Sequence, residues 1–235
     1  MPLTRFNGAV SPHKVFEAVT WPLADFKAIR KKVPGATVND VVLAVTAGGL
    51  REYLESHGEL PDEPLVAVAP INARSQAGEE AMPGNNISAM TVKIWTNIAD
   101  PLERLAAIRS TTKEAKDAKS GLGARMMTDL SQHIPSFNLA ALGRLLSTEK
   151  FALKFTNLFV SNVPGAQQQL FMNGARLTHQ YGLTPISNGM GLFVVAMSYG
   201  GNLSFNLISD RDIMPDIGYF RECLERAFVA LRDAD

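Results

Sequence analysis

The chain has 235 residues, 46% of them hydrophobic, and its 23 lysines and arginines balance 23 aspartates and glutamates. This hydrophobic content is ample for a sizeable core. The net charge of zero means that no overall electrostatic field attracts nucleic acid or an anionic membrane. No apolar run approaches the ~20 residues needed to span a bilayer. The single cysteine, Cys223, rules out an internal disulfide and fits a reducing compartment, so we expect a cytoplasmic protein.

The first elements expected along the chain are a strand and a short helix. Residues 14–20 are typical of a strand. Pro22 then opens a helix, because Leu23, Phe26 and Ile29 recur on one face behind it.

A longer helix is expected from Thr37 to about Gly58. Thr37 stands three residues before Asp40, which is the spacing of a capping box and places a carboxylate at the positive end of the helix dipole. Asn39 lies beside the face that we expect to be packed. That face consists of Val38, Val41, Val42, Val45, Gly49, Tyr53 and Leu54.

The middle of the chain alternates between strands and helices. Residues 64–70 form a short apolar run typical of a strand buried on both faces, and residues 87–95 alternate as a strand whose Met90 side is the core side. A polar loop over 72–86 separates them. Asp100 and Pro101 then open a helix that runs to about Lys119.

The last third is expected to contain two more strand regions and a final helix. The pattern predicts helices over 124–132 and 135–147, a strand over 155–160, a turn over 163–165, a hairpin over 191–209 closed around Gly200, Gly201 and Asn202, and a helix capped by Asp216. No repeat or linker divides the chain. We therefore expect one α/β domain over 1–235, with a mixed sheet flanked by helices.

Several of these segments resemble the bacterial wax ester synthase and diacylglycerol acyltransferase family. They occur in the family's order and span roughly residues 3–232. The matching segments are Thr37 to Ala44, Pro70 to Arg74 followed by Gly84 and Asn85, Ser161 to Gly165, Asn173 to Leu177, and the run from Gly191 to Asp210 with Ser198, Tyr199 and Pro215.

One element of that family is missing. The resemblance implies an HHxxxDG motif in an N-terminal half, whose second histidine is the general base on the acceptor alcohol. The histidines here are His13, His57, His133 and His179, and no two are adjacent. The chain thus resembles a C-terminal half alone, one half of a chloramphenicol-acetyltransferase-like, coenzyme A-dependent acyltransferase fold.

The resemblance implies transfer of a fatty acyl group from acyl-CoA, as co-substrate, to a long-chain alcohol or diacylglycerol. It implies no permanently bound cofactor and no metal. The HHxxxDG half would be a partner, and peripheral contact with a membrane or lipid droplet and self-association are further expectations. Two alternatives stay open. One is a non-catalytic module that binds acyl chains or a protein, and the other is a condensation-type enzyme acting on a carrier-protein thioester.

The candidate site residues each have a structural and a functional interpretation. Asp40 can cap its helix and Asn39 can satisfy nearby backbone, or both can shape the active site. The resemblance makes Arg74 a candidate to pair with the aspartate of HHxxxDG, with a surface arginine as the alternative, and Asn85 in the loop that follows is a further candidate to shape the active site. Ser161 and Asn162 either cap the turn that follows them or face the substrate channel.

Two weaker candidates lie elsewhere. Lys113, Lys116 and Lys119 recur on one helix face that either meets the phosphates of coenzyme A or is simply solvated. Another helix face either docks on lipid, lines an acyl tunnel or is ordinary core, and it consists of Ile134, Phe137, Leu142, Leu145 and Leu146. His133, His179 and Cys223 are interpreted as structural.

Overall fold

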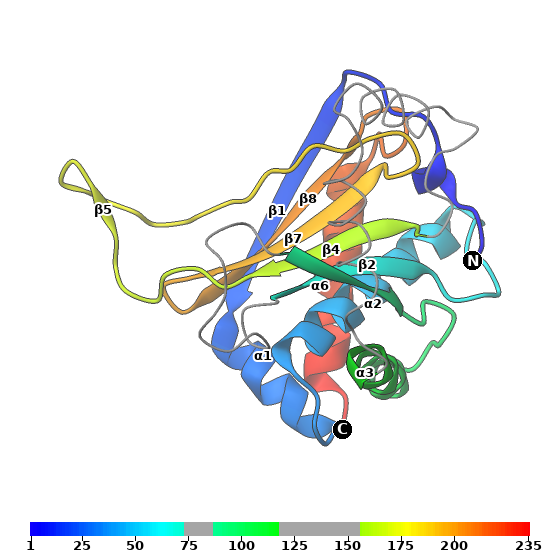
Figure 1. Cartoon of the computed structure of the whole chain (residues 1–235), viewed down its shortest axis with the longest axis horizontal. Helices are drawn as coiled ribbons and strands as arrows, with labels where there is room; N and C mark the ends of the chain where they lie inside the picture. Colours follow the sequence, from blue (N-terminus) through cyan, green and yellow to red (C-terminus); the bar gives the residue numbers. More distant parts are fainter. Residues whose placement is uncertain (73–86, 118–155) are drawn as a thin grey trace, which may run out of the picture.

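The computed structural model describes residues 1–72, 87–117 and 156–235, and in these ranges it shows a sheet of six strands backed by helices (Figure 1). The strand order is β1-β8-β7-β4-β2-β3, and a short hairpin of β5 and β6 stands apart from this sheet. The strands are β1 (Lys14–Pro22), β2 (Val66–Asn72), β3 (Ile87–Lys93), β4 (Leu158–Val163), β5 (Phe171–Met172), β6 (Ala175–Arg176), β7 (Leu192–Tyr199) and β8 (Asn202–Asp210).

The helices pack together on one face of the sheet. Their inward side chains form one core with alternate residues of the strands, such as Ala67 and Ala69 of β2 and Val194 and Ala196 of β7. The helical elements are η1 (Arg5–Asn7), α1 (Leu23–Ile29), η2 (Arg30–Lys32), α2 (Val38–Ser56), α3 (Pro101–Asp117) and α6 (Ile217–Asp233). The expected α/β class is confirmed.

The sheet is mixed, as the pattern of hairpins and helices predicted. Strand β4 pairs in parallel with both β2 and β7, whereas β1, β8 and β3 pair with their neighbours antiparallel. The hairpin of β7 and β8 closes through Gly200 and Gly201, whose φ angles of 53° and 84° suit a two-residue turn with positive φ at both positions. This turn is where the sequence predicted it.

Helix α2 is buried on more than one side. Its residues from Asp40 to Leu50 are all buried, because α3 and α6 pack against it as well as the sheet. Two glycines make the contact with α6 close: a Cβ on Gly49 would lie 2.7 Å from a Leu224 methyl, and one on Gly48 would lie 2.9 Å from the Ala227 Cβ. The buried surface of α2 is therefore wider than the apolar face that the sequence predicted.

Several details differ from the sequence prediction, and two strand ends and one helix cap have a clear physical reason. Strand β4 covers 158–163 rather than 155–160, because pairing with β7 continues through Asn162 and Val163. Strand β3 ends at Lys93, since Trp95 has a φ of 51° and cannot continue an extended chain. Asp216 occupies the N-cap position of α6, but its carboxylate accepts a hydrogen bond from the Tyr53 hydroxyl at 2.6 Å and makes none to the helix.

The second face of the sheet, opposite the helices, carries aromatic and apolar side chains. Phe159 of β4 and Phe193 of β7 stack at 5.2 Å between ring centroids, and Phe16 of β1 remains 41% exposed. A small cluster of Ile186, Val195 and Ile208 also lies on this face. The polar loop expected over 72–86 and the helices expected over 124–132 and 135–147 lie outside the described residues.

One buried carboxylate gives the fold a testable dependence on pH. Asp210, at the end of β8, is fully buried. It accepts hydrogen bonds from the backbone N–H of Ser11 (2.6 Å) and of Asp212 (2.9 Å), and from the Ser11 hydroxyl (2.9 Å). Burial opposes ionisation, but these donors outweigh it and lower the pKa of Asp210 below its ordinary value.

The direction in which pH changes the stability follows from the linkage between proton binding and folding. A carboxyl whose pKa is lowered on folding stabilises the protein above its unfolded pKa of about 3.9, and that stabilisation is lost as the pH falls below it. We expect Asp210→Asn to be less stable than the wild type at neutral pH and to lose less stability between about pH 4 and pH 2. Urea unfolding at a series of pH values measures this, and equal slopes for the two proteins would contradict it.

Candidate active site

Parts of the segments that resemble known motifs meet at one edge of the sheet: the start of α2 and the end of β4. Strands β2, β4 and β7 are parallel, so their carboxyl ends meet at the same edge, which we call the carboxyl edge. Helix α2 leads back to the start of β2, and its N-terminus therefore faces the carboxyl edge (Figure 1). In open α/β sheets this is the edge outside which ligands bind.

Asp40 is fully engaged in structural hydrogen bonds. Its Oδ2 accepts from the backbone N–H (2.7 Å) and hydroxyl (2.8 Å) of Thr37, which completes the capping box that the sequence predicted. Its Oδ1 accepts from the Thr112 hydroxyl of α3 at 2.7 Å. The side chain is completely buried. Asp40 thus caps α2 and fixes it to α3, so its contacts support the structural interpretation.

Asn39 differs from its neighbour. It lies in the first turn of α2 and is half-buried, and its side chain makes no hydrogen bond to any residue within the described ranges. An amide has two donors and an acceptor oxygen, and none of these is used by a residue that the structure describes. Asn39 is therefore the member of the pair with capacity to contact a ligand.

Ser161 and Asn162 are within β4, so their side chains point to opposite faces of the sheet. Ser161 shares the second face with Phe159, and Asn162 shares the helix-covered face with Leu158 and Val160. Both are half-buried, and in the described part of the chain neither side chain makes a hydrogen bond. Only one of the two can face a given channel.

The turn that follows β4 is stabilised by Ser198 of β7. The Ser198 hydroxyl accepts from the Gly165 backbone N–H at 3.1 Å and from the Gln167 amide at 3.2 Å. Gly165 packs so closely that a Cβ there would lie 2.1 Å from the Ser198 carbonyl oxygen. The sequence did not predict this role for Ser198, because the two residues become neighbours only through the pairing of β4 with β7.

The remaining site candidates are only partly described. Lys113 is exposed on α3 and forms no ion pair with the described residues, and Lys116 lies on the same helix. Arg74, Asn85 and Lys119 lie outside the described residues.

The other candidate side chains are now partly located. His179 is exposed, and its ring stacks on Tyr181 at 6.0 Å between centroids, whereas His133 lies outside the described ranges. Cys223 is buried in α6, and burial raises the pKa of its thiol, which makes it a poor nucleophile. Among the described residues no group of three or more His, Cys, Asp and Glu side chains is placed to hold a metal ion.

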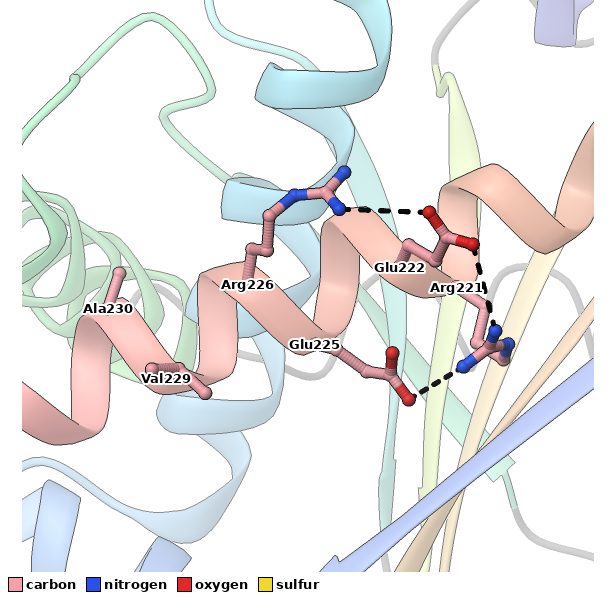
Figure 2. Close-up of a pocket in the computed structure, with 6 residues that line it drawn as sticks. All are labelled: Arg221, Glu222, Glu225, Arg226, Val229 and Ala230. Atoms are coloured by element: carbon pink, nitrogen blue, oxygen red, sulfur yellow. Dashed lines mark hydrogen bonds and ion pairs between the residues drawn. The ribbon is translucent and has the colours of Figure 1, made fainter.

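A hollow of about 640 Å³ lies on the outer face of α6, and Figure 2 shows its six lining residues. All of them belong to α6, and the charged ones pair with one another: Arg221 with Glu225 at 2.7 Å, and Arg226 with Glu222 at 3.8 Å. A shallow surface whose charges neutralise each other offers little to a ligand. We therefore do not place the site there.

The structure also shows an element that the sequence prediction missed. The chain leaves β4, extends away from the sheet through the β5–β6 hairpin, and returns over 177–191 to β7 (Figure 1). The signal was present: Asn173-Gly174 is a strong turn dipeptide for a two-residue hairpin. The flanking strands have only two residues each, which is too short to give an alternating strand pattern in the sequence.

Comparison with known proteins agrees with this geometry. The family model for the WS/DGAT C-terminal domain matches residues 83–232, and the model for the wax ester synthase/diacylglycerol acyltransferase catalytic domain matches residues 1–42. A Mycobacterium tuberculosis protein, whose name assigns it provisionally to the diacylglycerol O-acyltransferases, is 34% identical over 233 residues. That alignment covers 99% of this chain and 51% of the relative.

Solved structures extend the comparison. The wax ester synthase/diacylglycerol acyltransferase of Marinobacter aquaeolei matches with a TM-score of 0.77 and 28% identity, over 98% of this chain and 51% of that one. The epimerization domain from the third module of tyrocidine synthetase B shares the fold, with a TM-score of 0.58 and 12% identity over 98% of this chain and 50% of that one. The fold is thus that of the coenzyme A-dependent acyltransferases.

The sequence matches narrow this class to one family. The chain belongs to the wax ester synthase/diacylglycerol acyltransferase family. It spans about half the length of the curated relatives it matches. The match to the catalytic-domain model ends at residue 42, inside α2, and residues 1–42 supply β1 and α1 to the same sheet and core as the rest.

The contacts of Asp40 predict how substitutions affect stability. Asp40→Ala removes the capping box and the bond to α3, and we expect it to lower the free energy of unfolding by roughly 2–4 kcal/mol. Thr112→Val keeps the capping box but removes the bond between the helices and the bond of the same hydroxyl to the Arg109 carbonyl, and should cost about 1–2 kcal/mol. Asn39→Ala is the matched control and should stay within about 0.5 kcal/mol of wild type. Urea unfolding tests all three, and an Asp40→Ala protein as stable as wild type would refute the structural role.

The close approach at Gly165 gives a second prediction. A methyl group there meets the Ser198 carbonyl, so Gly165→Ala must displace the turn and should destabilise the protein by about 1–3 kcal/mol. Gly218→Ala, on the first turn of α6 with nothing nearer than 3.9 Å to the added Cβ, is the control and should be neutral or slightly stabilising. Thermal unfolding distinguishes the two, and similar midpoints for both variants would contradict the predicted clash.

Proposed function

We propose that this chain is the C-terminal half of an O-acyltransferase that moves a fatty acyl group from acyl-CoA to a long-chain alcohol or diacylglycerol. The observation that carries the proposal is the convergence at the carboxyl edge: the start of α2 and the end of β4 meet there in a chain that spans half of its acyltransferase relatives. The sequence contains no HHxxxDG motif. The general-base histidine therefore belongs to a second half.

The proposed reaction explains why two halves are needed. The alcohol oxygen attacks the thioester carbonyl carbon, the C–S bond breaks, and the proton taken by the base is returned to the coenzyme A thiolate. A base must stand beside the hydroxyl, and donors must face the developing oxyanion. The amide of Asn39 and the hydroxyl of Ser161 have uncommitted donors among the described residues, whereas the base is missing from this chain.

The other proposed contacts follow from the chemistry of the substrates. Arg74 is proposed to pair with the aspartate of HHxxxDG and Asn85 to lie in the same loop, while Asn162 supports the end of β4. Lys113, with Lys116 and Lys119, is proposed to meet the coenzyme phosphates, because ammonium groups bind phosphate as point charges. The apolar second face, with the stacked rings of Phe159 and Phe193, suits the acyl chain.

Lipid substrates also imply a place of action. We propose a cytoplasmic protein that acts at the surface of a membrane or lipid inclusion. Within residues 1–72, 87–117 and 156–235, no helix is long and apolar enough to cross a membrane. The contact that we propose with the membrane or inclusion is peripheral.

An acyl-transfer assay tests the proposal. The purified chain should form no ester from acyl-CoA with a long-chain alcohol or diacylglycerol, and adding an HHxxxDG-bearing half should start the reaction, because that half brings the base. Replacing the second histidine of that motif by alanine is the control and should abolish turnover. Ester formation by this chain alone would contradict the proposal. Acyl-chain binding without turnover in any mixture would favour a non-catalytic module.

A further inference from the structure

Asn206 of β8 is a completely buried polar side chain whose amide is only partly hydrogen-bonded. Its Nδ2 donates to the Val195 carbonyl at 2.8 Å and to the Ser204 carbonyl at 3.4 Å. Its Oδ1 accepts no hydrogen bond from any residue that the structure describes. Turning the amide over would set Oδ1 against two carbonyl oxygens, so the contacts of Nδ2 fix which atom lacks a partner.

A buried oxygen without a donor opposes folding. Valine or isoleucine would suit a buried strand position without this cost, so the polar side chain indicates a donor that the described residues do not supply. The neighbouring polar residue on the same face is different. The hydroxyl of Ser204 pairs with that of Thr20 at 3.0 Å, so Ser204 already has a partner.

The surroundings of Asn206 are mostly apolar. The strand register places it in one row across the second face with Ala18 of β1, Val195 of β7 and Ser161 of β4. The next row, which we call the apolar row, consists of Phe16, Ile208, Phe193 and Phe159. The second face therefore offers an apolar surface with one unpaired acceptor beside it.

The return segment between β6 and β7 covers this part of the second face (Figure 1). Tyr181 meets Phe16 of β1 edge to face, with 6.4 Å between ring centroids. Gly182 lies so close to β7 that a Cβ there would be 3.1 Å from a Val195 methyl, and Ile186 is buried in the same cluster as Val195. Strands β1 and β7 flank β8, so the segment crosses β8 over Asn206.

Residues 178–186, which we call the cover, are held loosely. Upstream of the cover, Tyr199 of β7 supports the base of the β5–β6 hairpin, because its hydroxyl accepts from the Leu170 N–H at 2.9 Å and donates to the Leu177 carbonyl at 3.1 Å. Within the cover no backbone group forms a hydrogen bond to another described backbone group, and Leu183 is 73% exposed. Segments with few buried contacts and no backbone hydrogen bonds open at a low cost in free energy.

We propose that the second face binds an acyl chain that carries a hydroxyl group, with Asn206 Oδ1 accepting the hydrogen bond of that hydroxyl beneath the cover. The apolar row suits the hydrocarbon part of such a chain. The buried acceptor selects a chain with one donor, because an unsubstituted chain leaves the oxygen unpaired. This inference rests on the proposed function, which supplies acyl-CoA as the source of the chain, and it makes Asn206 a residue that determines substrate choice.

The experiment measures binding apart from acyl transfer. Palmitate and a set of hydroxypalmitates, each with one hydroxyl at a different position, compete with a fluorescent fatty acid on the purified chain. At least one hydroxypalmitate should bind about tenfold more tightly than palmitate, because it supplies the hydrogen bond that Asn206 otherwise lacks. Asn206→Leu has a similar volume but no acceptor. It should lose this preference and bind palmitate at least as tightly as the wild type does.

Ser204→Ala is the matched control, because Ser204 is on the same face of β8 and its hydroxyl is already paired with Thr20. It should keep the preference for the hydroxypalmitate. Asn206→Leu should unfold at the wild-type temperature or above it, since it removes a buried unpaired oxygen. If this variant does not fold, the preference of the wild-type chain alone decides.

Equal affinity of the wild type for palmitate and for every hydroxypalmitate would overturn the inference, and so would the absence of binding. Either result leaves acyl transfer with the HHxxxDG-bearing half to be judged by its own assay. A preference that survives in Asn206→Leu would also overturn the inference. A preference that is lost in Asn206→Leu, in a chain that forms no ester with the HHxxxDG-bearing half, would support the inference and refute the proposed function.

Discussion

The parallel pairing of β4 with both β2 and β7 is the constraint on which the rest of the structure depends. Parallel strands end at the same edge, so three segments that are far apart in the sequence are brought to one place. Helix α2 must run antiparallel to β2 to reach its start, and this places Asn39 and Asp40 at that edge too. The carboxyl edge is therefore a consequence of topology, and no direct attraction between its polar residues is required.

Adjacent residues at the carboxyl edge have different roles. Asp40 is buried and satisfied by Thr37 and Thr112, whereas Asn39 keeps its amide free of the described residues. The same division holds for β4, where the strand period sends Ser161 and Asn162 to opposite faces. Pairs of residues that are read together in a motif can thus act separately, one maintaining the fold and the other available to a ligand.

The sequence predicted two features well that a local rule determines. The capping box of Thr37 and Asp40 and the glycine turn at Gly200 depend only on neighbouring residues, and both were found where expected. The end of β4 was misplaced because it is set by pairing with β7, which lies about thirty residues further along the chain.

The support that Tyr199 gives to the β5–β6 hairpin was invisible for the same reason. In the candidate site, the structural role of Asp40 could be predicted from its helix, while the contact between Gly165 and Ser198 could not. Most of the features that the sequence pattern did not predict therefore depend on pairing between residues that are far apart in the chain.

The central claim is that the carboxyl edge is the part of a shared acyl-transfer site that this chain contributes. Hydrogen exchange of the backbone amides of residues 37–42 and 161–167 tests it most directly, with and without an HHxxxDG-bearing half and a non-hydrolysable acyl-CoA analogue. The account predicts slower exchange in both segments when the half and the analogue are present, with no change on the outer face of α6. Unchanged exchange at the carboxyl edge in a mixture that forms ester would contradict the account.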